Sequence, residues 1–386
     1  MIPLRYNVRS LLVRRTTSVM TALAVAFVVM ILTLLLGFVG GLKRTMLLSG
    51  TPGNWIVMSQ GVTSESNSHV SQEQYEILRS RPELAADSAG WPLISPEEVT
   101  DFIVDADNAA DRATPSVRGV TPIAYRVHRN LRLLSGRWPN QGTAEMIVGR
   151  KLAAKHPELA PPREIRFGSR KWAIVGVFSD DDSVRESEIW TDLETLRQEV
   201  GETSGFNVVF LTLKPGTSGS FERALAGSAR LSVEAKPETE FYADGAQLAD
   251  QLRTLSLVFA SILAAGAIFG GMNTMYSAIA RRTREIGVLR ALGFGHGGLL
   301  TSFMTENLIL ALAGGVAGEL LTVAVAYLTG LQSRLMNVGQ FIFSFTLSPA
   351  VFAGGLAFAL LIGIIGGLPP AWRAMRIRVL EALHEA

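Results

Sequence analysis

Four long runs with almost no charged residue constrain this chain more than any other feature. Charge-free runs extend over 16–42 and 254–280, a third run over 308–331 contains Glu319 as its one charged residue, and a fourth lies within 335–372. About 20 apolar residues are enough for a helix to cross the hydrocarbon core of a bilayer. The sequence therefore predicts an integral membrane protein with four spanning helices, one near the amino end and three in the last third of the chain.

The limits of the first and last runs carry signals of their own. A basic flank that includes Arg9, Arg14 and Arg15 precedes the first run, as it would in a secretory signal peptide. The run is longer than the apolar region of such a peptide, and no small-residue cleavage motif precedes Lys43, so we expect an anchor that is not removed. Pro349 suits the first turn of a helix, which places the fourth span at about 349–368.

Charge is divided unevenly between the long middle segment and the rest of the chain. Residues 43–253 contain 24 Lys and Arg against 29 Asp and Glu, whereas the remainder contains 12 against 5. Basic residues in short loops stay on the cytoplasmic side of a membrane. We therefore expect both termini and the Arg-rich 281–290 loop to be cytoplasmic, and 43–253 to lie outside the cytoplasm. The basic excess follows from this topology, so it gives no reason to expect a nucleic-acid partner.

This division predicts three parts: 1–42 with the first span, an extracytoplasmic domain at 43–253, and 254–386 with the last three spans. The middle part mixes predicted strands and helices and is expected to have an α+β fold. Its strands are expected at 55–58, 171–178 and 206–213, and its helices at 71–79 and 192–200. Punctuation by Pro and Gly predicts a subdomain inserted at about 117–205. The chain has no cysteine, so this domain must be held by its core alone.

The sequence offers no pattern typical of a catalytic or metal site. The Gly-x-x-x-x-Gly-Lys-Ser/Thr phosphate loop, the Gly-x-Ser-x-Gly elbow and the His-Glu-x-x-His zinc motif do not occur, and the five histidines are scattered. The acidic run 180–182 does not have the alternating spacing of a calcium loop, so we interpret it as a solvated loop. We expect no catalytic residue, no metal and no cofactor bound by this chain.

Small residues and one carboxylate distinguish the predicted spans. Glycines recur at four-residue spacing, a pattern that lets helices approach closely in lipid. These pairs are Gly37 and Gly41, Gly266 and Gly270, Gly314 and Gly318, and Gly363 and Gly367. Glu319 is costly if it faces lipid, so it is either a proton or substrate site or a neutral group hydrogen-bonded within the bundle. No basic partner lies in the other spans, which favours the second interpretation.

Two stretches resemble a known family. The segment 271–293, followed by Glu306 and 314–315, resembles the FtsX-like permeases of MacB-type ABC transporters, and so does the carboxyl end at 366–383. The middle part matches the family's periplasmic core domain more loosely, at 136–139, 145–149 and 188–190. Val379 stands where the family usually has Pro, and Glu319 lies in a span that is normally neutral.

The resemblance implies a permease subunit that dimerises with a second copy or a paralogue and works with a separate ABC ATPase subunit, which binds ATP and Mg²⁺. In the family the loop matching 281–293 docks on the ATPase. The residues matched to this coupling role are Arg284, Glu285, Ile286, Gly287, Leu289, Arg290, Ala291 and Gly293. The first two spans form the dimer interface in the family, so Gly37, Gly41, Gly266 and Gly270 are candidate helix-packing and dimer residues.

The resemblance leaves the cargo and the output open. One hypothesis is a transporter in the cytoplasmic (inner) membrane, in which ATP hydrolysis moves the outer domain and drives export or extraction of a substrate, with a periplasmic adaptor and an outer-membrane duct as further partners. The alternative is a regulator of the same fold that activates cell-wall hydrolases or senses antimicrobial peptides. A membrane-tethered enzyme would need a catalytic constellation within 43–253, and the sequence contains none.

Overall fold

The structure is a computed structural model that describes residues 11, 13–101, 115–202, 204–228, 230–292, 295–331, 335–338 and 341–376. The chain forms two compact units. The helical unit comprises 1–40, 250–333 and 345–386, and the α/β unit comprises 41–249 and 334–344. The segment 334–344 was predicted to belong to the carboxyl-terminal part, but it lies in the α/β unit.

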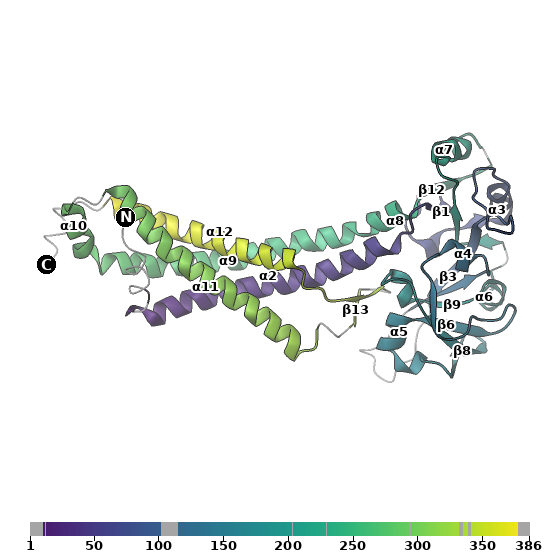
Figure 1. Ribbon diagram of the computed structural model, residues 1–386, viewed down its shortest axis with the longest axis horizontal. Helices are drawn as coiled ribbons and strands as arrows, with labels where there is room; N and C mark the ends of the chain where they lie inside the picture. Colours follow the sequence, from purple (N-terminus) through teal and green to yellow (C-terminus); the bar gives the residue numbers. More distant parts are fainter. Residues whose placement is uncertain are drawn as a thin grey trace. The chain divides into compact units, whose positions relative to one another are not determined.

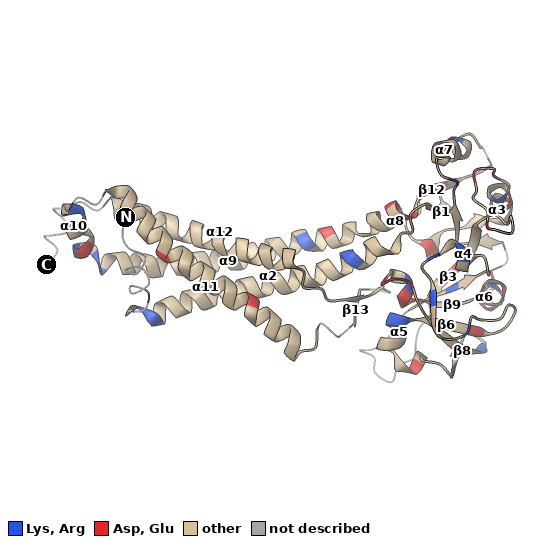
Figure 2. Cartoon of the chain, viewed as in Figure 1, with Lys and Arg blue, Asp and Glu red and all other residues tan. Residues whose placement is uncertain are grey.

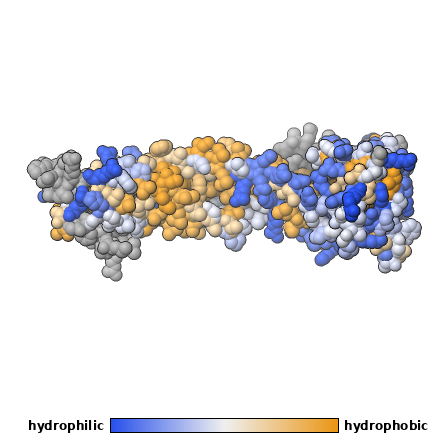
Figure 3. Space-filling model, turned by 90° about the horizontal axis from the view of Figure 1, so that it is seen from above, coloured by the Kyte–Doolittle hydropathy of each residue, from blue (hydrophilic) through white to orange (hydrophobic). Residues whose placement is uncertain are grey.

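The long helices are α2 (Arg15–Ser49), α9 (Gln247–Ala280), α11 (His296–Leu328) and α12 (Pro349–Met375), and the short helix α10 (Thr283–Ala291) follows α9 (Figure 1). Within the described residues, four helices are long and apolar enough to cross a membrane: α2, the segment Glu238–Ala280 that ends with α9, α11 and α12. Charged residues are sparse along them (Figure 2), and hydrophobic side chains form a band over the visible face of these helices (Figure 3). The predicted class, a helical membrane protein with a mixed α and β domain, is confirmed.

Glycines set how closely the long helices pack. A Cβ atom added to Gly314 would lie 2.7 Å from the carbonyl oxygen of Ala22, and one added to Gly318 would lie 2.5 Å from that of Ala26. Both distances are shorter than any side chain tolerates, so α11 packs directly on the backbone of α2. At Gly363 the same atom would lie 2.6 Å from the Cβ of Ala311, which brings α12 equally close to α11. Such close approach replaces the hydrophobic driving force that lipid does not provide.

The α/β unit is built on a sheet of ten strands among the described residues, in the order β12-β1-β11-β3-β4-β9-β6-β8-β5, with β7 beside β8. Most neighbours are antiparallel, and the β4–β9 and β6–β8 pairs are parallel. Two short antiparallel pairs lie outside this sheet, β2–β10 and the hairpin β13 (Leu335–Val338) and β14 (Phe341–Ser344). The remaining strands are β1 (Asn54–Ser59), β2 (Val70–Ser71), β3 (Ile94–Asp101), β4 (Ser116–Val120), β5 (Arg132–Gly136), β6 (Glu145–Gly149), β7 (Arg163–Phe167), β8 (Arg170–Ser179), β9 (Ile189–Asp192), β10 (Gly205–Phe206), β11 (Val208–Thr212) and β12 (Val233–Pro237).

Short helices join these strands and cover the sheet. They are α3 (Gln72–Arg79), α4 (Ala124–Val127), α5 (Arg150–Lys155), α6 (Leu193–Val200), α7 (Ser218–Ala226) and α8 (Glu238–Gly245), with single turns of 3-10 helix at η1 (Glu65–Asn67), η3 (Pro157–Leu159) and η4 (Val184–Ser187). The expected helix at 71–79 is confirmed: Ser71 caps α3 through the backbone N–H of Gln74, and the Gln74 side chain accepts from the Ser71 N–H in return. The strands expected at 55–58 and 171–178 are confirmed as β1 and β8, and the one expected at 206–213 is divided between β10 and β11.

Two halves of the sheet carry separate cores. In one half, α3 and α7 contribute Leu78 and Phe221 to a cluster over β1 and β11. In the other, α5 and α6 contribute Leu152 and Leu196 to a cluster over β4, β6, β8 and β9. Among the described residues, the strands of the second half all come from 116–192, and the one link to the first half within the sheet is the β3–β4 pair. Ile342 of the β13–β14 hairpin is buried in the second core.

Candidate functional site

Helix α10 carries the predicted coupling residues, and it presents a different face from the one that the sequence suggested. Ile286 is 2 % exposed and packs inside the helical unit. Its cluster consists of Ile279, Leu299, Phe303, Ala371 and Ala374. Gly287 is also buried. Ile286 therefore fixes α10 against α9, α11 and α12, and neither of the two residues lies on an outward surface.

The outward face of α10 is formed by residues spaced about one helical turn apart. Arg284, Glu285 and Ala291 are exposed. Val288 is 45 % exposed, and Leu292, directly after the helix, is 71 % exposed. We call Arg284, Val288, Ala291 and Leu292 the α10 surface. Val288 and Leu292 were missed from the sequence, although their spacing of four from Arg284 and from each other was the signal that could have found them.

The other predicted coupling residues are placed as follows. Arg290 is half-buried, and one of its guanidinium nitrogens lies 3.1 Å from Nε2 of His296 at the start of α11. The exposed Glu285 lies 3.9 Å from the partly buried Arg282, a long contact that contributes little to stability. Leu289 belongs to α10 by its backbone, and Gly293 lies outside the described residues. The α10 surface is thus an exposed apolar strip bordered by basic side chains, suited to contact a protein partner.

An ion pair lies in the same half of the helical unit as α10. Arg14 Nη2 donates to Glu306 Oε1 at 3.1 Å, and both side chains are largely buried. They line a cavity of about 40 Å³ between α2, α9 and α11, together with Thr21, Thr274 and Asn307. A space of this volume is enough for a few water molecules.

The two glycine pairs predicted for helix packing and dimerisation have unlike surroundings. A Cβ added to Gly37 would lie 2.7 Å from the ring of Phe345, and one added to Gly41 would lie 2.1 Å from the carbonyl oxygen of Ser344. These glycines therefore contact the segment before α12 within the same chain. For Gly266 and Gly270, apart from the adjoining backbone of α9 itself, no atom of the described residues lies within 4 Å of the added Cβ, so this side of α9 is open in the single chain.

Glu319 fills a niche between three helices. Thr33 Oγ1 of α2 donates to Glu319 Oε1 at 3.1 Å, and the absent side chain of Gly355 in α12 leaves the space that this carboxyl occupies. The second carboxyl oxygen is buried, and no described residue forms a hydrogen bond with it. This placement matches the interpretation of Glu319 as a group hydrogen-bonded within the bundle.

Arg118 on β4 is the centre of a buried ionic network in the α/β unit. Its guanidinium donates to Glu188 through Nε and Nη2, each at 2.8 Å, to Glu97 at 2.9 Å and to Glu65 at 2.7 Å. Nε2 of His128 lies 2.8 Å from the other oxygen of Glu97. Burial alone would raise the pKa of Glu97, but His128 and Arg118 outweigh it and lower this pKa to about 2. The network ties η1, β3 and β4 to Glu188, the residue before β9, across the junction of the two half-sheets.

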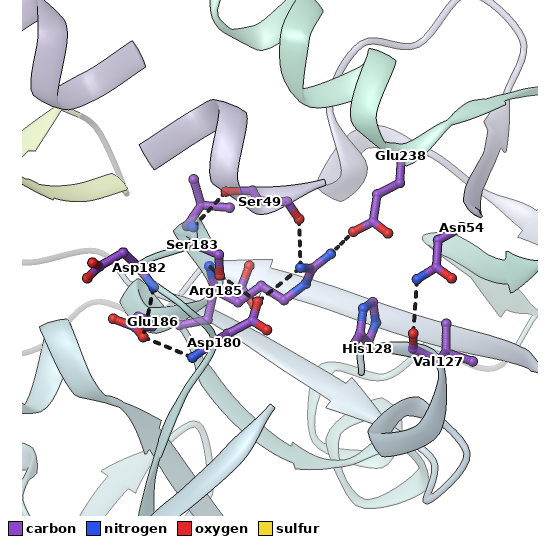
Figure 4. A network of polar contacts seen from close by, with 12 residues as sticks. Ser49, Asn54, Val127, His128, Asp180, Asp182, Ser183, Arg185, Glu186 and Glu238 are labelled. Atoms are coloured by element: carbon purple, nitrogen blue, oxygen red, sulfur yellow. Dashed lines mark hydrogen bonds and ion pairs between the residues drawn. The ribbon is translucent and has the colours of Figure 1, made fainter. Parts of the chain in front are cut away.

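A second network surrounds Arg185 in η4 (Figure 4). Nη1 donates to the backbone oxygen of Ser49 at 3.0 Å and to Asp180 at 3.1 Å, and Nη2 pairs with Glu238. Burial would lower the pKa of Arg185, but its attraction to Tyr242, Glu238 and Asp180 raises this pKa well above its usual value. The expectation of a solvated loop at 180–182 is wrong at its first residue, because Asp180 is 3 % exposed and neutralises Arg185.

Phe210 on β11 lies between the two networks. The guanidinium carbons of Arg118 and Arg185 each lie 5.7 Å from the centre of its ring. Within the described residues, no group of three or more His, Cys, Asp or Glu side chains is arranged to hold a metal ion. Arg118 and Arg185 are each surrounded by carboxylates, an arrangement suited to holding elements in place.

Comparison with known proteins agrees with this architecture. The family model described as the MacB-like periplasmic core domain matches residues 18–226, and the model described as the FtsX-like permease C-terminal matches residues 257–379. The first covers more than half of the chain. Their order along the sequence follows that of α2, the α/β unit and the last three long helices.

Relatives with assigned names share parts of this chain. The macrolide export ATP-binding/permease protein MacB of Nitrobacter winogradskyi is 36 % identical over 137 residues, which cover 35 % of this chain and 20 % of that protein. The pyoverdine export ATP-binding/permease protein PvdT of Pseudomonas syringae is 39 % identical over 133 residues, covering 34 % and 19 %. MacB of Neisseria gonorrhoeae is 26 % identical over 235 residues, covering 58 % and 35 %. The matched segments thus span about a fifth to a third of the length of these relatives.

Among solved structures, the periplasmic region of MacB from Actinobacillus actinomycetemcomitans aligns with 51 % of this chain and 94 % of that one, at 13 % identity and a TM-score of 0.38. Family membership rests on the sequence matches and not on this alignment. The chain belongs to the MacB family of ABC transporter permeases, in which a MacB-like periplasmic core domain is joined to an FtsX-like permease domain.

Proposed function

We propose that this chain is the permease subunit of a MacB-like ABC transporter and that it couples ATP hydrolysis by a separate ATPase subunit to motion of the α/β unit. ATP and Mg²⁺ would bind to that ATPase, since the sequence contains no phosphate-binding loop of the Walker A type. The motion would drive export or extraction of a substrate. The relatives named for macrolide export and pyoverdine export support the transporter hypothesis over a regulatory one.

The proposal includes an orientation in the cytoplasmic membrane. The short Arg-rich segments at the amino terminus, in the 281–290 loop and after Trp372 would face the cytoplasm, because basic residues in short loops resist translocation. The α/β unit would then lie outside the cytoplasm, where a periplasmic adaptor and an outer-membrane duct could engage it. The open side of α9 at Gly266 and Gly270 supports a dimer with a second permease subunit.

The observation that carries the proposal is the α10 surface. Its exposed Val288 and Leu292 would be unfavourable in water unless a partner covers them, and Arg284 adds a charge that can pair with an acidic surface. Ile286 anchors the same helix in the helical unit, so a force applied to α10 would reach α9, α11 and α12. Docking on a cytoplasmic ATPase would use both properties.

The test is retention of the ATPase. The tagged chain is purified in mild detergent from the cells that produce it naturally, and co-purifying proteins are identified by mass spectrometry. We expect an ABC ATPase with the wild-type chain and a loss of at least about tenfold with Val288→Asp/Leu292→Asp, because burying two carboxylates in an apolar contact costs more than 1.4 kcal/mol. The matched control is Leu134→Asp/Val200→Asp, two exposed apolar residues of the α/β unit.

Retention of the ATPase by the Val288→Asp/Leu292→Asp variant at the wild-type level would overturn the docking role of α10. Orientation is tested separately, because a chain without cysteine accepts single reporters. An impermeant thiol reagent should label Ser66→Cys and Ser218→Cys in spheroplasts and should label Gly295→Cys after lysis alone. The reverse pattern would contradict the proposed topology.

A further inference from the structure

The chain passes between the two units in three places. One passage is at residues 40–41 within α2, a second at 249–250 near the start of α9, and the third consists of the two ends of the segment 334–344. Each passage therefore has a short portion inside the α/β unit: the end of α2, helix α8 with the start of α9, and the β13–β14 hairpin. These three portions contact one another within the α/β unit through η4.

The end of α2 is bonded to η4 twice. The backbone N–H of Val184 donates to Ser49 Oγ at 2.8 Å, and Nη1 of Arg185 donates to the Ser49 carbonyl oxygen at 3.0 Å. Ser49 is the last residue of α2. The carbonyl groups at the end of a helix have no partner within the helix, and Arg185 supplies one for Ser49. A cation at this end also interacts favourably with the helix dipole.

Helix α8 is bonded to the same arginine. Nη2 of Arg185 pairs with Glu238, the first residue of α8, and both side chains are fully buried. An acidic residue at the start of a helix is favourable because the amino end of the helix dipole is positive. One guanidinium thus joins the carboxyl end of α2 to the amino end of α8, as Figure 4 shows.

The hairpin is bonded to the last residue of η4. Ser187 Oγ accepts from the backbone N–H of Ile342 at 2.9 Å and lies 3.3 Å from the Ile342 carbonyl oxygen. Ile342 is 4 % exposed and belongs to the core of the second half-sheet. The four residues of η4 therefore contact all three passages.

The turn itself is held firmly in the second half-sheet. Glu186 Oε1 accepts from the backbone N–H groups of Asp180 and Asp182 at 2.9 and 3.2 Å, and Arg150 donates to the other oxygen at 3.0 Å. All four residues of η4 are at most 2 % exposed. A displacement of η4 would therefore move the loop 180–182 and the strands β8 and β9 beside it.

We propose that η4 is the joint at which the motions of α2, α8 and the β13–β14 hairpin are combined and passed to the second half-sheet, with Arg185 and Ser187 as positioning residues. The inference rests on the proposed function, because it names the place in the α/β unit where ATP-driven motion would arrive. A turn bonded to a single passage would follow that passage alone. A turn bonded to all three moves when they move together.

The experiment uses the full chain in complex with its co-purified ATPase, reconstituted in lipid nanodiscs. Spin labels are attached to Gln198→Cys on α6, which covers the second half-sheet, and to Tyr327→Cys on α11, both exposed positions. Pulsed electron resonance gives the distance distribution with and without ATP and vanadate. We expect the wild-type distribution to shift with nucleotide and the shift to fall below about half in Ser49→Ala/Ser187→Ala, because the lost hydrogen bonds connect two of the three passages to η4.

The matched control is Thr191→Val, which removes a buried hydroxyl that donates to the backbone oxygen of Glu145 at 2.8 Å without touching η4. The control should shift as the wild type does, and both variants should hydrolyse ATP at the wild-type rate. A merely structural role would leave the shift unchanged in Ser49→Ala/Ser187→Ala, and this result would overturn the joint. An equal loss in Thr191→Val would overturn it too.

A wild-type complex that hydrolyses ATP without any shift would contradict the proposed function itself, so the two failures are distinct. If Ser49→Ala/Ser187→Ala does not fold, Arg185→Lys is the second variant. Lysine keeps the charge between Asp180 and Glu238 but cannot donate from a planar fork to three partners at once. It should reduce the shift, and an unchanged shift with Arg185→Lys would overturn the inference.

Discussion

The two units of this protein are stabilised in opposite ways. The α/β unit buries Arg118 and Arg185 at its centre, and each of these cations is paired with carboxylates. The helical unit buries glycine and alanine at its helix contacts and keeps few charges along its long helices. The difference teaches that the surrounding solvent determines which interactions stabilise each unit. Water drives apolar side chains into a core, whereas helices in lipid are stabilised by close packing.

Removal of the central arginine of the first network should have the largest effect. Arg118→Met would leave Glu65, Glu97 and Glu188 buried without their cation, and we expect the free energy of unfolding of the α/β unit to fall by about 3–5 kcal/mol. Urea titration followed by tryptophan fluorescence measures this. Arg137→Met is the control, because its bidentate pair with Glu145 is exposed and should matter little. Equal losses would show that burial does not separate the two pairs.

A side chain forced between helices should have the next largest effect. Gly318→Leu would push α11 away from Ala26 and Val29 of α2, and we expect a loss of about 1–3 kcal/mol in the stability of the helical unit. Thermal unfolding in detergent measures it. Gly266→Leu, on the open side of α9, should keep the stability of the single chain and weaken dimerisation in cross-linking. A stable, dimeric Gly266→Leu variant would exclude this side of α9 from the dimer contact.

The contributions of Glu97 and Glu98, two neighbouring residues of β3, to the free energy of unfolding should change with pH in opposite directions. Burial, followed by repulsion from Glu202, raises the pKa of Glu98 to about 7, whereas that of Glu97 is lowered. A raised carboxyl pKa favours the folded state at low pH, so this stability is lost as the pH rises from 4.5 towards about 7. Over this pH range the free energy of unfolding should decline by on the order of 1–2 kcal/mol, after allowance for screening by water. Glu98→Gln should remove this decline. Urea titrations across this pH range measure the free energy of unfolding. An equal decline in the wild type and in Glu98→Gln would contradict the assignment.

Neutralisation of Glu319 should have the smallest effect. Glu319→Gln keeps the shape of the side chain and its contact with Thr33, and a hydrogen bond between membrane helices contributes less than about 1 kcal/mol. We expect thermal stability, dimerisation and ATPase activity of the complex close to those of the wild type. A large loss of activity with normal assembly would indicate that Glu319 carries protons or binds substrate.

Local patterns were sufficient to predict much of the fold. Charge-free runs indicated the long helices, and the capping residues of α3 and the β-branched run of β1 were legible without any tertiary information. The assignment of 334–344 to the α/β unit could not be predicted, because it depends on the burial of Ile342 and its bonds to Ser187, residues 155 positions apart. Such a contact leaves no periodicity in either segment.

The candidate sites were harder to predict for the same reason. The spacing of 281–293 indicated a helix, but the sequence alone could not show which side faces inward, and the structure buries Ile286 and exposes Val288. An acidic run is usually solvated, so Asp180 gave no sign of its burial beside Arg185. Arg185 itself lies in a polar stretch without any pattern that would distinguish it from a surface arginine.

The position of Phe210 has a consequence for how this protein can vary. Its ring lies equally far from the buried guanidinium groups of Arg118 and Arg185, so both cations interact favourably with the same aromatic ring. A substitution at Arg118 would alter the environment in which any change at Arg185 is tolerated, and their effects should not add. Substitutions at the two arginines and at Phe210 therefore depend on one another. We expect a replacement at one of these positions to be tolerated only together with compensating replacements at the others.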